Sequence, residues 1–112
     1  MSVIMYHNPK CSKSRATLAL LNENGVEPTI VEYLVTPPST DEMKTILKKL
    51  DKAPADILRK KEAAEEGVDA DQDADALIAA MVAHPRVIER PIVVKGDKAA
   101  VGRPPENVLG IL

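Results

Sequence analysis

The sequence predicts one α/β domain with a mixed β-sheet. A short apolar run at residues 2–6 is followed by a helical segment and by a β-branched run at residues 29–34, and two strands joined by a crossover helix lie parallel. Later in the chain, Gly96 and Asp97 separate two further runs, which is the spacing of a two-residue turn between antiparallel strands. With 112 residues the chain can bury one core, so we expect a single domain over residues 1–112.

The first strand ends at the breaker His-Asn-Pro at residues 7–9 and leads directly into a helix from Ser14 to Asn24. Gly25 is predicted to end this helix in the left-handed conformation. The helix face directed at the core is expected to contain Ala16, Leu18, Ala19 and Leu21.

A helical insertion is predicted at about residues 39–84. Ser39 and Glu42 have the spacing of a capping box, a short helix is expected at residues 56–61, and the acidic stretch 62–76 is interpreted as a surface excursion. His84 and Pro85 end the last helix of the insertion. The expected core positions of its first and last helices are Met43, Ile46, Leu47, Leu50, Leu77, Ile78, Met81 and Val82.

After the insertion, strands are predicted at residues 92–95 and 98–101, followed by a helix that begins at Pro105. The buried face of that helix is expected to contain Val108, Leu109 and Leu112. The predicted order is therefore β-α-β, a helical insertion, and β-β-α.

The composition argues against several classes of protein. The chain has 15 Lys and Arg against 17 Asp and Glu, a formal net charge of −2, and no long basic block, so no nucleic-acid partner is expected. The N-terminal apolar run is too short for a signal peptide or a membrane span, and a single cysteine cannot form an internal disulfide. We therefore expect a cytoplasmic protein with no membrane partner.

Cys11, the only cysteine, is either a small buried residue or a reactive thiol. Its neighbours are polar or cationic: Asn8, Lys10, Ser12, Lys13, Ser14 and Arg15. A helix N-terminus and nearby cations can lower the pKa of a thiol from about 8.5 to roughly 3.5–7.5. The sequence therefore favours a reactive thiolate at this strand-to-helix junction.

An electropositive thiolate site is also suited to an oxyanion, which arginine binds through several fixed donors. Arg90 and Arg103 precede prolines at the two ends of the predicted hairpin, so we expect them to lie close together. Arg59 is a third arginine away from the cysteine loop. The alternative is that all three are ordinary surface residues.

The polar residues around the thiol also have two interpretations each. His7 either orients groups near Cys11 or is structural, and Ser12 and Ser14 either support the site or cap the helix. His84 is expected only to end a helix, where its charge suits the dipole. The residues expected to support a thiol site are His7, Asn8, Ser12, Ser14 and Arg15.

Four segments together resemble one known family. YHNPKCSKSR at 6–15, PP at 37–38, ERPIVV at 89–94 and GRPPENVLGIL at 102–112 are similar, in this order and spacing, to the glutaredoxin-dependent arsenate reductase family (ArsC). The resemblance implies a thioredoxin-like (glutaredoxin-like) fold with an inserted helical region. By position it implies that Cys11 is the nucleophile, that Arg59, Arg90 and Arg103 bind the anion, and that Pro91 is the cis-proline of this fold.

The reaction that this resemblance implies begins with attack of Cys11 on arsenate, giving a covalent adduct whose charge the arginines offset. Glutathione then attacks the adduct and glutaredoxin removes the mixed disulfide; with no second cysteine in the chain, the reductant is an external thiol. No bound metal, flavin or nucleotide is expected, and the protein is expected to be a monomer.

Two other functions stay open on the sequence. One is a glutaredoxin-like thiol transferase or another thiol-dependent reductase, in which the anionic pocket holds the carboxylates of glutathione. The other is a regulator of the same fold that binds RNA polymerase, usually through a two-cysteine switch. The single cysteine argues against this regulator.

Overall fold

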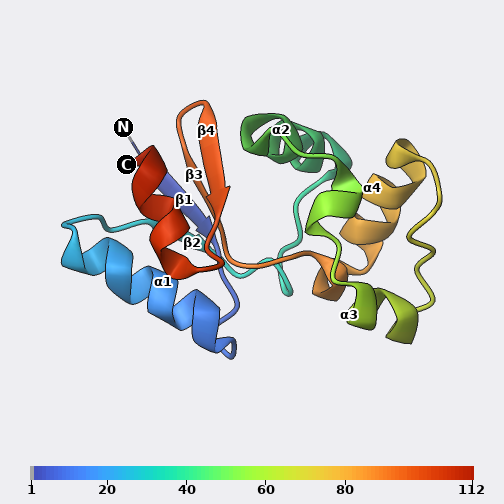
Figure 1. Ribbon diagram of the computed structural model, residues 1–112, viewed down its shortest axis with the longest axis horizontal. Coiled ribbons are helices and arrows are strands. Elements are labelled where there is room, and N and C mark those ends of the chain that lie inside the picture. Colours follow the sequence, from blue (N-terminus) through green and yellow to red (C-terminus); the bar gives the residue numbers. More distant parts are fainter. Residues whose placement is uncertain (1) are drawn as a thin grey trace. The chain divides into compact units, whose positions relative to one another are not determined.

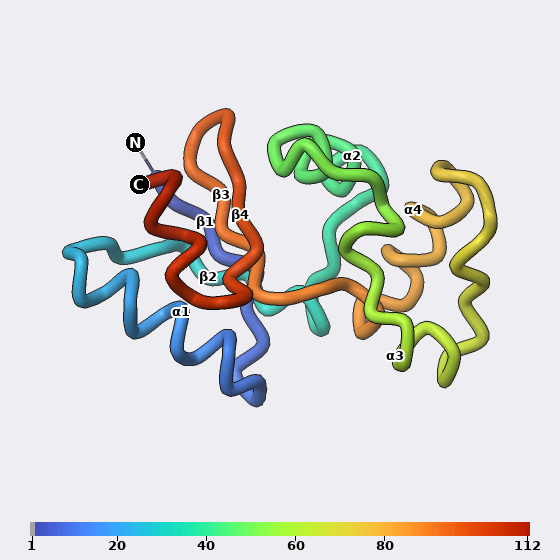
Figure 2. The backbone as a smooth tube through the Cα atoms, viewed as in Figure 1, coloured from blue at the N-terminus to red at the C-terminus, as the bar shows by residue number. Residues whose placement is uncertain are grey.

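The computed structural model describes residues 2–112 and divides them into two compact units (Figure 1). We call them the sheet unit, which contains the chain up to Thr36 and from Arg90 onward, and the helical unit, Pro37–Glu89. The backbone leaves the sheet unit after Thr36 and returns to it at Arg90 (Figure 2). The helical segment expected at residues 39–84 lies within the helical unit.

The sheet unit is built on a four-stranded sheet in the order β2-β1-β3-β4. Its strands are β1 (Val3–Tyr6), β2 (Thr29–Val31), β3 (Ile92–Lys95) and β4 (Lys98–Val101). β1 runs parallel to β2 and antiparallel to β3, which is antiparallel to β4. The predicted mixed sheet is therefore confirmed.

Two glycines have the backbone conformation that the sequence predicts for the ends of elements. Gly25, with φ +75°, follows α1 (Ser12–Glu23), and Gly96, with φ +61°, begins the turn between β3 and β4. Residues with a Cβ are strained at such positive φ values, so glycine suits both positions.

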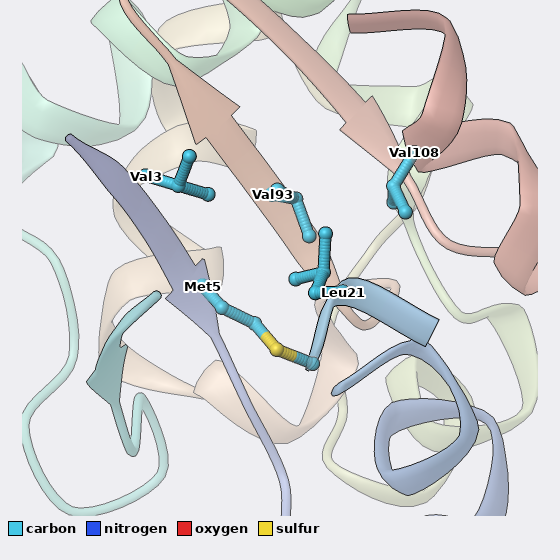
Figure 3. Close-up of a cluster of buried hydrophobic side chains, with 5 residues drawn as sticks. All are labelled: Val3, Met5, Leu21, Val93 and Val108. Atoms are coloured by element: carbon cyan, nitrogen blue, oxygen red, sulfur yellow. The ribbon is translucent and has the colours of Figure 1, made fainter. Parts of the chain in front are cut away.

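The core of the sheet unit lies where α1 and η3 (Pro105–Ile111) cover the sheet. Figure 3 shows the side chain of Met5 directed toward Leu21 of α1. Burying a side chain of this size contributes about 1.5–3 kcal/mol. The buried cluster consists of Val3, Met5, Leu21, Val93 and Val108.

The buried face of α1 differs from the predicted one. Ala16 and Ala19 are exposed, whereas Ser14, Thr17 and Leu21 are buried. These three positions lie on one side of a helix that begins two residues earlier than predicted. The prediction is confirmed for Leu21 and for partly buried Leu18, which packs against the core, and was wrong for Ala16 and Ala19, because two of the buried positions carry hydroxyl groups instead.

Two other elements of the sheet unit also differ from prediction. The strand expected at residues 29–34 ends at Val31, and the next residues form a turn in which the Val35 N–H donates to the Glu32 carbonyl oxygen (2.9 Å). The last helix, η3, is a 3-10 helix with three residues per turn. Its core face therefore pairs Val108 with Ile111, while the predicted Leu109 and Leu112 are 40% and 37% exposed.

The helical unit contains α2 (Thr40–Leu50), η1 (Pro54–Ile57), α3 (Lys60–Glu65), α4 (Ala74–Ala83) and η2 (Pro85–Val87). The predicted capping box is present: the Ser39 hydroxyl oxygen accepts from the Glu42 N–H, and the Glu42 carboxylate accepts from the Ser39 N–H. α2 and α4 pack together. Their predicted core residues are buried, except for partly buried Val82: Met43, Ile46, Leu47, Leu50, Leu77, Ile78 and Met81.

The short helix predicted at residues 56–61 was wrong, because tertiary pairing interrupts it. Leu58 forms an antiparallel bridge with Ile88, and the Arg59 N–H donates to the Val87 carbonyl oxygen (2.7 Å). The chain is therefore extended between η1 and α3.

The acidic stretch 62–76 is not only a surface excursion. Glu62 and Ala63 in α3 are buried, and so is Val68. His84 does end α4, and its Nδ1 lies 3.1 Å from Oε1 of Glu66. None of the helices in residues 2–112 is long and apolar enough to cross a membrane.

Candidate active site

Cys11 lies at the junction between β1 and α1, where its backbone begins the helix. It is the N-cap of α1 with extended geometry, φ −93° and ψ 126°. Its N–H donates to the Asn8 carbonyl oxygen (3.0 Å), and its carbonyl oxygen accepts from the Arg15 N–H (3.0 Å). The thiol makes no capping bond and is partly exposed, so it can be reached at the positive end of the helix dipole.

A buried hydroxyl holds the loop before Cys11. Ser14 Oγ accepts from the Asn8 N–H (3.0 Å) and lies 2.7 Å from His7 Nδ1. Ser14 is fully buried and His7 is 6% exposed. Asn8 Oδ1 also accepts from the Lys10 N–H (3.0 Å). Ser14 therefore joins the thiol loop to the end of β1 rather than capping the helix.

The protonation state of His7 fits this arrangement. Burial lowers the pKa of His7, Glu32 opposes that effect, and Arg15 adds to it. The ring is therefore neutral near pH 7. Because the Ser14 oxygen accepts the Asn8 N–H, we assign the Ser14 proton to a hydrogen bond with an unprotonated His7 Nδ1.

Arg90 and Arg103 meet at the base of the β3–β4 hairpin, as predicted. Arg103 Nε donates to the Arg90 carbonyl oxygen (2.8 Å), and Arg103 Nη2 lies 3.8 Å from Cys11 Sγ. Each arginine precedes a cis peptide bond, to Pro91 and Pro104. The cis bond at Pro91 agrees with the resemblance, whereas the one at Pro104 was not foreseen.

The pKa of Cys11 lies below its ordinary value. Burial alone raises it, but the Ser14 N–H, the Arg90 side chain, the Lys13 N–H and the positive charge of Arg90 together lower it. All of these stabilise a negative sulfur. The site can therefore hold Cys11 as a thiolate nucleophile beside arginine donors.

Arg59 belongs to the helical unit and faces carboxylates. Its Nε donates to Glu62 Oε2 (2.7 Å), and its Nη1 lies 3.9 Å from Glu89 Oε1. The sequence singled out Arg59 and gave no sign of Glu62, which lies in a stretch interpreted as exposed. A glutamate three positions after Arg59, which is the N-cap of α3, is a spacing that could have indicated the pair.

Two other predicted support residues have local roles. Arg15 Nη1 donates to the Pro9 carbonyl oxygen (3.0 Å), and this exposed bond connects α1 to the loop before Cys11. Ser12 is the exposed first residue of α1 and is not the cap.

The sequence interpretation missed the close packing of the Gly102 backbone against Thr17 and Pro91. A Cβ at Gly102 would lie 2.5 Å from Thr17 Oγ1 and 2.9 Å from Pro91 Cγ, so only glycine fits without movement of these neighbours. The Gly102 N–H also donates to the Pro91 carbonyl oxygen (2.9 Å). The glycine directly before Arg103 could have indicated this packing.

A mixed sheet, a cysteine at the first strand-to-helix junction and a buried cis-proline define a thioredoxin-like protein with a thiol site. In residues 2–112, no group of three or more His, Cys, Asp and Glu side chains is placed to hold a metal ion.

Comparison with known proteins identifies the family within this class. An arsenate reductase from Vibrio cholerae has a similar structure, with a TM-score of 0.93, 49% identity, and coverage of 100% of this chain and 98% of that one. Among curated sequences, an arsenate reductase from Haemophilus influenzae is 47% identical over 100% of both chains, and the Escherichia coli uncharacterized protein YfgD is 49% identical over 98% of this chain and 96% of its own. The ArsC family model matches residues 6–111. The chain belongs to the ArsC family.

Proposed function

We propose that the protein reduces arsenate to arsenite through a covalent adduct on Cys11. The observation that carries this proposal is the placement of Arg103 Nη2 at 3.8 Å from Cys11 Sγ, in a site that lowers the pKa of the thiol. The relatives named arsenate reductases support arsenate as the oxyanion.

In the first step, the Cys11 thiolate attacks arsenic, a sulfur–arsenic bond forms, and one arsenate hydroxyl takes up a proton from the solvent and leaves as water. Arg103 and Arg90 offset the charge on the remaining oxygens, since guanidinium groups bind tetrahedral oxyanions through directed donors. The loop bonds to Asn8 and Ser14 keep the sulfur at the helix N-terminus during attack.

In the second step, a glutathione thiolate attacks the sulfur of Cys11. The sulfur–arsenic bond breaks, its electron pair reduces arsenic from the +5 to the +3 state, and arsenite leaves. Cys11 and glutathione are then joined in a mixed disulfide, from which a glutaredoxin thiol removes the glutathione. This sequence is proposed because the chain has one cysteine and therefore no internal resolving thiol.

Glutathione and glutaredoxin act as external partners in the cytoplasm, the protein works as a monomer, and no metal, flavin or nucleotide is bound. For Arg59, the anion-binding role is proposed from the resemblance, and an Arg59→Lys variant with a raised KM for arsenate would support it.

The test is a turnover assay that measures arsenite with arsenate, glutathione and glutaredoxin, omitting each in turn. We expect arsenite only when all three are present. Arsenite formed at an equal rate without glutaredoxin would contradict the proposed resolving step. No arsenite formation, together with rapid removal of glutathione from a glutathionylated peptide, would favour the thiol transferase.

A further inference from the structure

Arg59, the arginine of the helical unit that is proposed to bind the anion, is paired with the carboxylate of Glu62. Glu62 is a buried carboxylate, 7% exposed, in α3. Its Oε2 accepts from Arg59 Nε at 2.7 Å, and the two side chains are 9% and 21% exposed. A charge-assisted bond of this length in a shielded place fixes the orientation of the guanidinium.

The backbone of Arg59 is fixed independently of that pair. The Arg59 N–H donates to the Val87 carbonyl oxygen at 2.7 Å, and the Glu89 N–H donates to the Ile57 carbonyl oxygen at 2.7 Å. The bridge between Leu58 and Ile88 lies between these two bonds. With the main chain held this way, Glu62 sets the direction of the arginine side chain.

One donor of this guanidinium is buried and unsatisfied. Within residues 2–112, Arg59 Nη1 has no hydrogen-bond partner, and Glu89 Oε1, at 3.9 Å, is beyond hydrogen-bond distance. A buried donor without a partner is unfavourable and uncommon in folded proteins.

We propose that Glu62 is a positioning residue for Arg59. By accepting from Nε, it holds the guanidinium so that Nη1 stays without a hydrogen-bond partner, and a shift of the side chains that cover Nη1 would let it donate to an oxygen of the oxyanion. This inference rests on the proposed anion-binding role of Arg59. It assigns to Glu62 a contribution to arsenate affinity, made through Arg59 and without contact with the substrate.

The position of the acceptor can be separated from its charge. Glu62→Asp keeps the charge but withdraws the carboxylate by one methylene, while Glu62→Gln keeps an acceptor oxygen at the same distance and removes the charge. A positioning role depends on the acceptor. If Glu62 instead acts by reducing the charge of Arg59, the effect depends on the negative charge of its carboxylate. Removing that negative charge would then strengthen anion binding.

The experiment measures kcat and KM for arsenate in the full chain with glutathione and glutaredoxin. We expect Glu62→Asp to raise KM at least about fivefold with kcat changed less than about twofold, and Glu62→Gln to stay within about twofold of the unmodified protein. Glu65→Asp and Glu65→Gln are matched controls, because Glu65 lies on the same helix and pairs with exposed Arg86. Neither control should change KM.

Other outcomes overturn the inference. A fall in KM for Glu62→Gln with no change for Glu62→Asp would assign Glu62 a charge role, and unchanged or equally raised KM in both variants would contradict positioning. Thermal unfolding and the rate of Cys11 alkylation by iodoacetamide check the fold of each variant. An unmodified protein without arsenate turnover would contradict the proposed function itself, whereas a failure confined to these variants contradicts only this inference.

Discussion

The two units of the molecule use arginine in opposite ways. In the sheet unit, Arg103 donates to a backbone carbonyl and lies beside the Cys11 sulfur. In the helical unit, Arg59 and Arg86 face carboxylates: Arg59 contacts Glu62, and exposed Arg86 lies 2.8 Å from an oxygen of Glu65. A carboxylate acceptor, unlike a carbonyl, offsets the charge of the guanidinium that it orients, so Arg103 keeps more positive charge for a bound anion than Arg59 does.

The largest effect is expected when the sulfur of Cys11, which lies beside Arg103 in the sheet unit, is removed. Cys11→Ser keeps the size of the side chain and the backbone bonds of the loop, but a serine hydroxyl stays protonated near pH 7, so we expect arsenate turnover to fall at least about 1,000-fold. Thermal stability should not fall, because serine is a preferred N-cap residue and the backbone bonds of the loop remain. Turnover near that of the unmodified protein would rule out a covalent role.

The next test changes the geometry of the donors and keeps their charge. Arg90→Lys and Arg103→Lys lose the forked donors, so we expect arsenate turnover to fall at least about tenfold, or about 1.4 kcal/mol in each case. Alkylation by neutral iodoacetamide should change much less. Arg86→Lys, in the helical unit, is the matched control and should leave turnover unchanged. Equal effects at all three positions would remove the contrast between the units.

A smaller effect is expected in the pH dependence of the thiol. Because the folded site lowers the pKa of Cys11, the thiolate forms at lower pH than in a free cysteine, and the rate of alkylation should reach its midpoint below about pH 8.5. Arg90→Gln removes one cause of that lowering and should move the midpoint upward. A midpoint at or above that of a free thiol would contradict the assignment of Cys11 as a thiolate.

The smallest effect on activity is expected from the helical unit's capping box. Ser39→Ala removes the acceptor for the Glu42 N–H and should reduce the free energy of unfolding by about 1 kcal/mol. The midpoint of Cys11 alkylation should not change. A shifted midpoint, measured on the same preparation as the unfolding curve, would show that the thiol depends on this cap.

Much of the sheet unit could be predicted from sequence, because its signals are local. The apolar runs, Gly25 and the Gly96 turn specify strands and their ends, and a hairpin brings its two ends together, so the proximity of Arg90 and Arg103 followed. The position of Cys11 before a helix also followed from neighbouring residues. These inferences need only the geometry of one element or one turn.

The parts that could not be predicted depend on contacts between distant segments. Residues 56–61 have the composition of a helix, but Leu58 pairs with Ile88, thirty positions later. Ser14 and Thr17 look like exposed helix positions until His7, Asn8 and Gly102 are placed against them. A buried hydroxyl is stable only where partners are present, and the sequence does not show those partners.

The sheet's edges have a consequence for self-association. An exposed strand edge can recruit another chain and begin aggregation. Here one edge, β2, has only three residues, and the other, β4, begins with exposed Lys98 and packs beside η3 (Figure 1). An incoming strand would gain few hydrogen bonds at β2 and would meet a charged side chain at β4, so the unit that carries Cys11 is a poor template for edge-to-edge aggregation.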